Sequence, residues 1–167
     1  METSNKTNQL DRAASLEKLR DVAHKQTAFL CTHTQPYEIS ARPMMTQQVT
    51  DEGKLLFFVG IDQDSVLQIK RQSQVSVLYH NGSDYLSLRG TARTYRNQEK
   101  IKELYTPVAN AWFDGPNDPN LLLLEVNVED AHYWGTENGT ITTLYKMAKA
   151  AVTGEDADIG TSKELTV

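Results

Sequence analysis

The sequence is poor in the features that mark exported, membrane-spanning and disulfide-stabilised proteins. Its only cysteine, Cys31, cannot form a disulfide within the chain. No apolar run approaches the roughly 20 residues needed to cross a bilayer, and the polar segment 1–8 lacks the basic-then-apolar order of a secretory signal. We therefore expect a reduced, cytoplasmic protein.

Clustered positive charge and catalytic signatures are also missing. The net charge is −5, and no run is rich in lysine or arginine, so we expect neither nucleic acid nor an anionic membrane as a partner. The four histidines have no metal-ligand spacing, which predicts surface or turn positions and no metal site. The sequence contains no phosphate-binding loop, dinucleotide fingerprint or hydrolase elbow.

Short β-rich runs bounded by turn residues make up most of the sequence. A chain of 167 residues suits one domain, and we expect it over residues 10–152, between a disordered N-terminus (1–9) and a mobile tail (153–167). Many short strands with few helices predict a mainly β fold with peripheral helices, a closed or partly closed barrel. The expected strands are 27–34, 37–49, 54–60, 74–79, 84–95 and 121–130, and the expected helices are 10–25, 62–72, 98–105, 107–113 and 142–152.

The expected strand at 37–49 is unusually polar on one face. The two-residue period of a strand places Ser40, Arg42, Met44 and Thr46 on that face. Pro43 removes one hydrogen-bond donor from the strand, which predicts an edge or a bulge where backbone groups stay free for a ligand. From these residues alone, a solvated edge strand with an ordinary surface arginine is the alternative.

A second feature is an aromatic strand that leads directly into a helix start. Phe57 and Phe58 are followed by Asp64 and Ser65, which are suited to begin a short helix. A helix N-terminus favours anions, so a planar ring and a phosphate could bind side by side here. The alternative is that the phenylalanines are core residues and that Asp64 or Ser65 is only a cap.

The order of these segments resembles the pyridoxamine-phosphate-oxidase-like flavin-binding split barrels. The segments that carry the resemblance are SARPM (40–44), LLFF (55–58), DS (64–65), QVSV (74–77) and LRGTA (88–92). Three later segments resemble the general-stress-protein branch of the same superfamily: AWFDGP (111–116), YW (133–134) and LYKMAKA (144–150). The resemblance implies a six-stranded antiparallel split β-barrel that forms a homodimer, with FMN bound at the subunit interface. FAD, or no cofactor, is the alternative.

The resemblance also implies a set of flavin-binding residues. The strand from Arg42 to Gln47 would line the isoalloxazine ring and the ribityl chain, and Ser65 would bind the phosphate. Arg89 shares the strand parity of Tyr85 and could reach the same site. The complete expected set is Arg42, Pro43, Met44, Met45, Thr46, Gln47, Phe58, Val59, Ser65, Tyr85, Arg89, Trp112 and Trp134.

Two departures from the family pattern bear on function. Related proteins carry basic residues directly after the phosphate-site serine, where this chain has Val66 and Leu67. Losing a charged contact worth roughly 1.5 to 3 kcal/mol would weaken FMN roughly ten-fold or more, so Arg42 would have to contribute more. Residues 135–167 contain no arginine, unlike the basic C-terminal segment of the true oxidase, which argues against pyridoxamine-phosphate oxidation.

The sequence therefore predicts a flavin-dependent oxidoreductase of unknown substrate, linked to the stress response. One alternative is a flavin- or haem-binding stress or sensory module without turnover. Another is a dimer that retains the fold without any cofactor.

Overall fold

The computed structural model describes residues 12–135 and 161–165, and most of them lie in antiparallel β-strands. Among the described residues, no helix is both long and apolar enough to span a membrane. The elements in chain order are α1 (Arg12–Ala23), β1 (Thr27–Gln35), β2 (Glu38–Val49), β3 (Leu55–Gly60), α2 (Asp64–Arg71), β4 (Gln74–Asn81), β5 (Asp84–Tyr95), α3 (Gln98–Leu104), a 3-10 helix η1 (Pro107–Ala111), β6 (Leu121–Gly135) and β7 (Thr161–Leu165).

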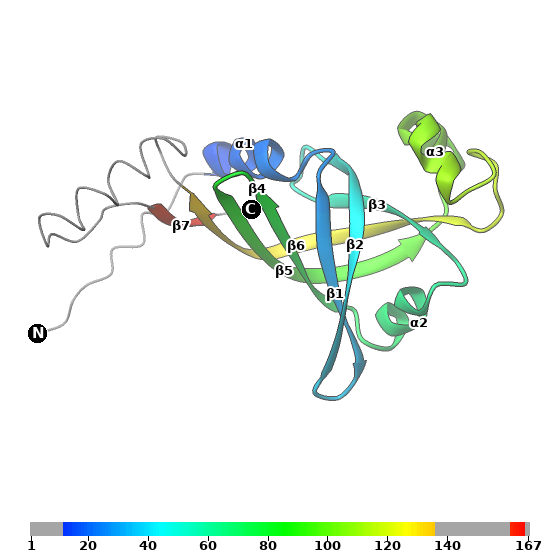
Figure 1. Ribbon diagram of the computed structural model, residues 1–167, viewed down its shortest axis with the longest axis horizontal. Coiled ribbons are helices and arrows are strands. Elements are labelled where there is room, and N and C mark those ends of the chain that lie inside the picture. The colour runs from blue at the N-terminus through cyan, green and yellow to red at the C-terminus, as the bar shows by residue number, and fades with distance from the viewer. Residues whose placement is uncertain (1–11, 136–160, 166–167) are drawn as a thin grey trace, which may run out of the picture.

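Strands β1 to β6 form a ring of antiparallel pairings. Their order is β3-β2-β1-β4-β5-β6, and β3 also pairs with β6, which closes the ring (Figure 1). Every residue of β3 is buried, because the strand lies between two neighbours and is covered on both faces. A fully covered strand reads as a continuous apolar run rather than an alternating one. The arrangement confirms the mainly β, six-stranded split-barrel prediction.

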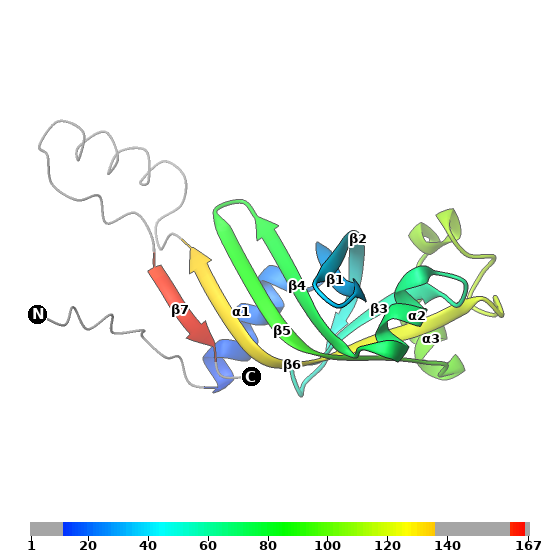
Figure 2. The same cartoon turned by 90° about the horizontal axis from the view of Figure 1, so that it is seen from below.

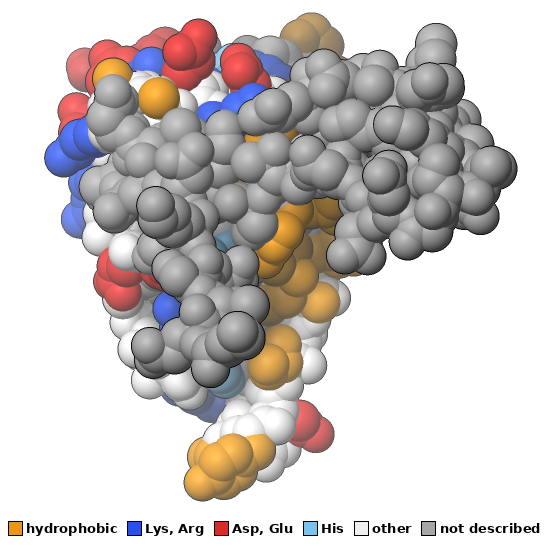
Figure 3. All heavy atoms as spheres, turned by 90° about the vertical axis from the view of Figure 1, so that its left-hand side faces the viewer, with side chains coloured by type: hydrophobic (Ala, Val, Ile, Leu, Met, Phe, Trp, Pro, Cys, Tyr) orange, Lys and Arg blue, Asp and Glu red, His pale blue; other side chains and the backbone are white. Residues whose placement is uncertain are grey.

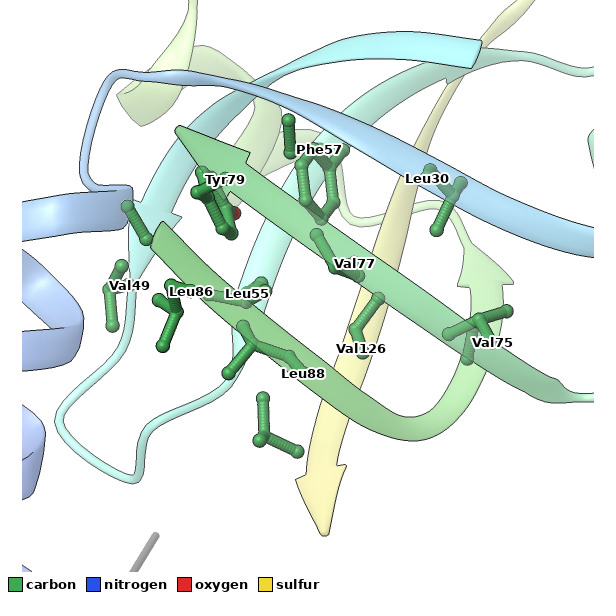
Figure 4. Packing of buried hydrophobic residues seen from close by; sticks show 14 of the residues in the cluster. Leu30, Val49, Leu55, Phe57, Val75, Val77, Tyr79, Leu86, Leu88 and Val126 are labelled. Atoms are coloured by element: carbon green, nitrogen blue, oxygen red, sulfur yellow. The ribbon is translucent and has the colours of Figure 1, made fainter. Parts of the chain in front are cut away.

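The inside of the ring holds the main hydrophobic core. Leu30, Val77 and Leu88 come from three neighbouring strands and are 0% exposed, and Figure 4 shows such side chains pointing toward one another. The helices α1 and α2 contribute further buried residues, including Leu19 and Val66. Helix α1 lies near the start of β1, whereas α2 contacts the part of β1 nearer the β1–β2 turn (Figure 1).

A second hydrophobic cluster covers the outer face of β3 and β6. Phe58 and Leu123 face away from the main core and pack with Ile101 and Leu104 of α3. Figures 1 and 2 show α3 beyond the ends of the strands, well apart from α1. Because both faces of β3 are covered, the strand is held rigidly between two cores.

Strand β7 corrects one expectation. Residues 153–167 were expected to be mobile, but residues 161–165 pair with β6, and Leu165 is only 3% exposed within the main core. Strand β6 was expected to end at residue 130 but runs to Gly135 and supplies the edge for this pairing. The tail expected at 153–167 thus contains a strand that was not expected from the sequence, while the segment 1–9 and the expected helix at 142–152 lie outside the described residues.

A close backbone contact accompanies a register shift between β5 and β6. The shift occurs between Arg89 and Gly90. A Cβ atom at Gly90 would overlap the carbonyl oxygen of Asn127. The strands can approach this closely only because residue 90 has no side chain.

Candidate functional site

The ring opens between β2 and β3. These strands pair only where Thr46 to Val49 meet Leu55 to Phe57, with a register shift at Gln47. In the part of the chain that the structure describes, β2 residues 38–45 pair only with β1, and β3 residues 58–60 pair only with β6. Beyond the Thr46–Phe57 pair the two strands therefore separate, and each has one edge that no other described strand pairs with. Such edges offer the row of donors and acceptors that the sequence predicted around Pro43.

Arg42 lies at this opening and faces the inside of the ring. Its guanidinium donates to Thr32 Oγ1 at 3.1 Å, Ser40 Oγ at 3.0 Å and Gln68 Oε1 at 2.8 Å. The hydroxyl of Thr32 also donates to Gln68, at 2.6 Å. These contacts tie β1, β2 and α2 together at one point, and every one of these acceptors is neutral.

The charge of Arg42 is accordingly not neutralised by a direct ion pair. Among the described residues, no carboxylate lies within the 4.0 Å that defines a salt bridge to its guanidinium. Burial lowers the pKa of Arg42, while the charges of Asp64 and Cys31 act in the opposite direction. Because an arginine stays protonated in proteins, the opening holds a half-buried cation that can still accept an anion.

Helix α2 presents its N-terminus near the same opening. Its cap residue Gln63 makes no side-chain capping hydrogen bond. Ser65 in the first turn is 1% exposed, and its Oγ has no hydrogen-bond partner among the described atoms. An unpaired buried hydroxyl is costly, and a bound acceptor would remove that cost. The phosphate contact expected for Ser65 stays a prediction.

Other predicted residues gather on the outer face of the ring. The strand registers place Pro43, Met45, Tyr85 and Trp134 on this face. Tyr85 is 52% exposed and Trp134 is 44% exposed, and the two residues are cross-strand neighbours. Hydrophobic side chains gather on the side of the molecule where β7 lies (Figure 3). A hollow of about 430 Å³ is lined by Leu78, Tyr79, Tyr85, Leu86, Ser87 and Trp134.

Two histidines stack on the aromatic rings of this outer face. The ring of His80 lies 4.5 Å from that of Tyr85 at an angle of 18°. His132 lies 5.9 Å from Trp134 at 25°. The imidazoles orient the two large rings, which suits the hollow to a flat aromatic group.

Arg89 does not lie beside Arg42 within one chain. It lies on the outer face, where Nη2 and Nε donate to Asp130 Oδ2 at 2.6 and 2.9 Å. Arg42 points to the inner face, opposite Leu30. The charge of Arg89 is therefore already balanced, and help from Arg89 at the opening is not supported within a single chain.

The remaining predicted residues serve mainly in packing. Thr46 is buried and shares a 2.6 Å hydrogen bond with Tyr79, whose pKa is raised by burial. Met44 packs against the main core, which also contains the side chain of Val59. Gln47 is 7% exposed and donates to the carbonyl of Met45. Because the side chain of Val59 is buried in the core, this residue could contact a ligand only through its backbone.

Phe58 and Trp112 belong to the region around η1. The ring of Phe58 packs against Tyr105 at 6.0 Å and edge-on against Phe113 at 6.4 Å. Trp112 directly follows η1 and is 71% exposed. Within one chain the structure thus divides the predicted set among the opening, the outer face and the η1 region.

Sequence reasoning missed the residues that hold Arg42. Thr32 and Gln68 lie on other elements than Arg42, and no local pattern joins them to it. The spacing of Asp64 and Gln68 was a usable signal, because residues four apart share one face of a helix.

The protein is a split barrel. Its six antiparallel strands form a ring that opens between β2 and β3, and a cation and a helix N-terminus lie at the opening. The model of the "Pyridoxamine 5'-phosphate oxidase like" family matches residues 14–158, so the chain belongs to this family.

Individual relatives are distant. The chain is 23% identical over 135 residues to protein bli-3 of Neurospora crassa, covering 73% of this chain and 65% of that protein. It is 35% identical over 63 residues to general stress protein 26 of Bacillus subtilis, covering 38% of this chain and 45% of that protein. The matched region thus spans less than two thirds of either relative.

Solved structures share the fold over more of the chain. A candidate general stress protein 26 from Jannaschia sp. CCS1 is 26% identical, with a TM-score of 0.72, covering 94% of this chain and 99% of that one. The general stress FMN/FAD binding protein of Xanthomonas citri is 22% identical, with a TM-score of 0.64, covering 75% of this chain and 91% of that one.

Proposed function

We propose that this protein binds a flavin nucleotide, FMN, and acts as a flavin-dependent oxidoreductase in the stress response. The observation that carries the proposal is the cation at the opening: Arg42 lies in the part of β2 that pairs only with β1, contacts α2 at Gln68, and has only neutral hydrogen-bond partners. The isoalloxazine edge needs backbone donors and acceptors, and the phosphate needs a positive field. The Xanthomonas citri protein of the same fold is an FMN/FAD binding protein, which supports this choice of ligand.

The same proposal includes a homodimer. The hollow with Tyr85 and Trp134 lies on the outer face, whereas Arg42 faces inward. A second copy packed against the outer face would bring its own opening to this hollow, so that one subunit supplies the polar contacts and the other supplies aromatic rings. The bound flavin would supply the redox chemistry, and the chain would orient it and exclude water.

The test compares two flavins that differ only in the phosphate. Arg42→Ala is expected to weaken FMN binding about 10- to 100-fold, because losing one charged hydrogen bond costs roughly 1.5 to 3 kcal/mol. Riboflavin, which has no phosphate, should weaken much less. Quenching of flavin fluorescence measures both dissociation constants. Arg12→Ala is the matched control, because it removes the same charge from an exposed position on α1.

Two results would contradict this assignment of Arg42. Equal weakening of both flavins would mean that Arg42 contacts the ring or the ribityl chain, or only supports the strand. Unchanged binding of both would mean that Arg42 takes no part in binding the flavin.

A further inference from the structure

Asp64 places a carboxylate on the surface of α2 that faces Arg42. Resting on the flavin function proposed above, we propose that Asp64 is a specificity-determining residue: it occupies the positive field of the opening and disfavours the phosphate of FMN. The site then still binds FMN, but the phosphate adds less affinity than it would beside Arg42 alone.

The placement follows from helix geometry. Gln68 accepts a 2.8 Å hydrogen bond from Arg42, so its face of α2 points toward the guanidinium. Asp64 lies four residues earlier in the same helix, one turn nearer the N-terminus and on the same face. The carboxylate of Asp64 is exposed, and no described cation lies within the 4.0 Å that defines a salt bridge to it. Its charge acts favourably on the ionised form of Arg42.

The charges near the opening almost cancel. Arg42 contributes one positive charge and Asp64 one negative charge, and the N-terminus of a helix adds about half a positive charge. The first turn of α2 supplies no further cation, since Val66 is buried and Leu67 is 54% exposed but apolar. The basic residues Lys70 and Arg71 lie in the last turn. A phosphate group of about −1.5 to −2 charges therefore meets a field much weaker than Arg42 alone would provide.

The same carboxylate also stabilises α2 itself. Acidic groups in the first turn interact favourably with the helix dipole, and Asp64 is the acidic residue of that turn. It does for the helix what a bound phosphate would otherwise do. Without the Asp64 carboxylate, both the helix dipole and the charge of Arg42 would act on the ligand phosphate.

The experiment measures FMN and riboflavin binding to the full chain with Asp64→Asn, by quenching of flavin fluorescence. FMN should bind about ten-fold tighter, as expected for removing a like charge several ångströms from the phosphate in a partly screened site. Riboflavin should change by less than about two-fold, because its terminal hydroxyl carries no charge. Asp64→Glu keeps the charge and should retain the ratio of the two dissociation constants found in the unmodified protein.

Asp21→Asn is the matched control, because it removes the same charge from an exposed position on α1, remote from α2 (Figure 1). Equal shifts for FMN and riboflavin, or an unchanged FMN affinity in Asp64→Asn, would overturn the role of Asp64 while leaving the flavin function standing. Failure of the unmodified protein and of every variant to bind either flavin would instead overturn the flavin function, and this proposal with it.

Discussion

Glu125 is a carboxylate that the fold buries at the edge of the second hydrophobic cluster. Its side chain is 11% exposed and accepts from Arg93 Nε at 3.0 Å, Lys54 Nζ at 3.3 Å and Tyr95 Oη at 3.3 Å. Burial opposes ionisation of Glu125, but the hydrogen bonds and charges of Arg93 and Lys54 outweigh it and hold its pKa below the usual value. Strands β5 and β6 and the residue directly before β3 meet at this one carboxylate.

Glu125→Gln should therefore destabilise the protein in a pH-dependent way. The pKa of Glu125 is lower in the folded state than in the unfolded state, where it is about 4.3. The ionised carboxylate therefore contributes fully to the unfolding free energy above the unfolded-state pKa. This contribution is lost as the pH falls through the folded-state pKa. We expect the variant to lose about 1 kcal/mol of unfolding free energy at pH 7 and a smaller amount at about pH 3, where protonation of Glu125 in the unmodified protein is more advanced.

Urea unfolding at both pH values measures this difference. Glu103→Gln is the control, because Glu103 forms an exposed pair with Lys100 within α3, and such pairs contribute little. A destabilisation by Glu125→Gln that stays constant between the two pH values would show that the charge of Glu125 contributes nothing.

At the scale of the elements, β5 and β6 can pair along their full length because residue 90 is a glycine. Gly90→Ala would force a methyl group against the backbone of Asn127, where only movement of a strand can make room. We expect a loss of about 2 to 4 kcal/mol of unfolding free energy, measured by urea unfolding.

Gly82, in the turn between β4 and β5, is the contrasting position. It has φ = +62°, and a Cβ atom there would meet nothing within 4 Å. Asparagine tolerates this backbone region, so Gly82→Asn should cost less than about 1 kcal/mol. If both variants lose the same small amount, the close approach at Gly90 is not what makes glycine necessary there.

The elements that the sequence predicted well are those with strong local patterns. Expected strand 84–95 coincides with β5, because apolar alternation and the preceding turn residues fix both of its ends. Strand β7 was missed, because its sequence TSKEL has one apolar residue and its pairing depends on an edge of β6 that only the tertiary structure creates. Local pattern cannot report such a distant partner.

The candidate site was predictable to a similar extent. The polar face around Arg42 and the free edge around Pro43 follow from strand period and from proline chemistry. The hydrogen bonds from Arg42 to Thr32 and Gln68 join three separate elements, and strand period contains no information about them. The division of the predicted residues between inner and outer faces likewise required the register of all the strands.

For the molecule as a whole, the apolar outer face bears on assembly. Phe29 and Leu78 are direct cross-strand neighbours on this face and are 55% and 41% exposed. If this face is the homodimer contact, Leu78→Asp should bury an unpaired charge there and give a monomer, because such burial is costly. Lys102→Asp adds a carboxylate to the exposed surface of α3 and should leave the dimer intact. Light scattering at micromolar concentration distinguishes these results, and a monomeric unmodified protein would contradict the homodimer.

The pairing of β3 with β6 also determines when the chain can finish folding. The residues that it joins are about sixty to seventy positions apart, and contacts between such distant segments are slow to form because a long loop must close first. During synthesis, β1 to β5 leave the ribosome before β6 does, so the free edge of β3 and the inner apolar side chains stay uncovered until residue 126 has emerged. A nascent chain of this protein therefore passes through a stage that invites strand pairing between neighbouring copies, and chaperone binding at that stage would protect it.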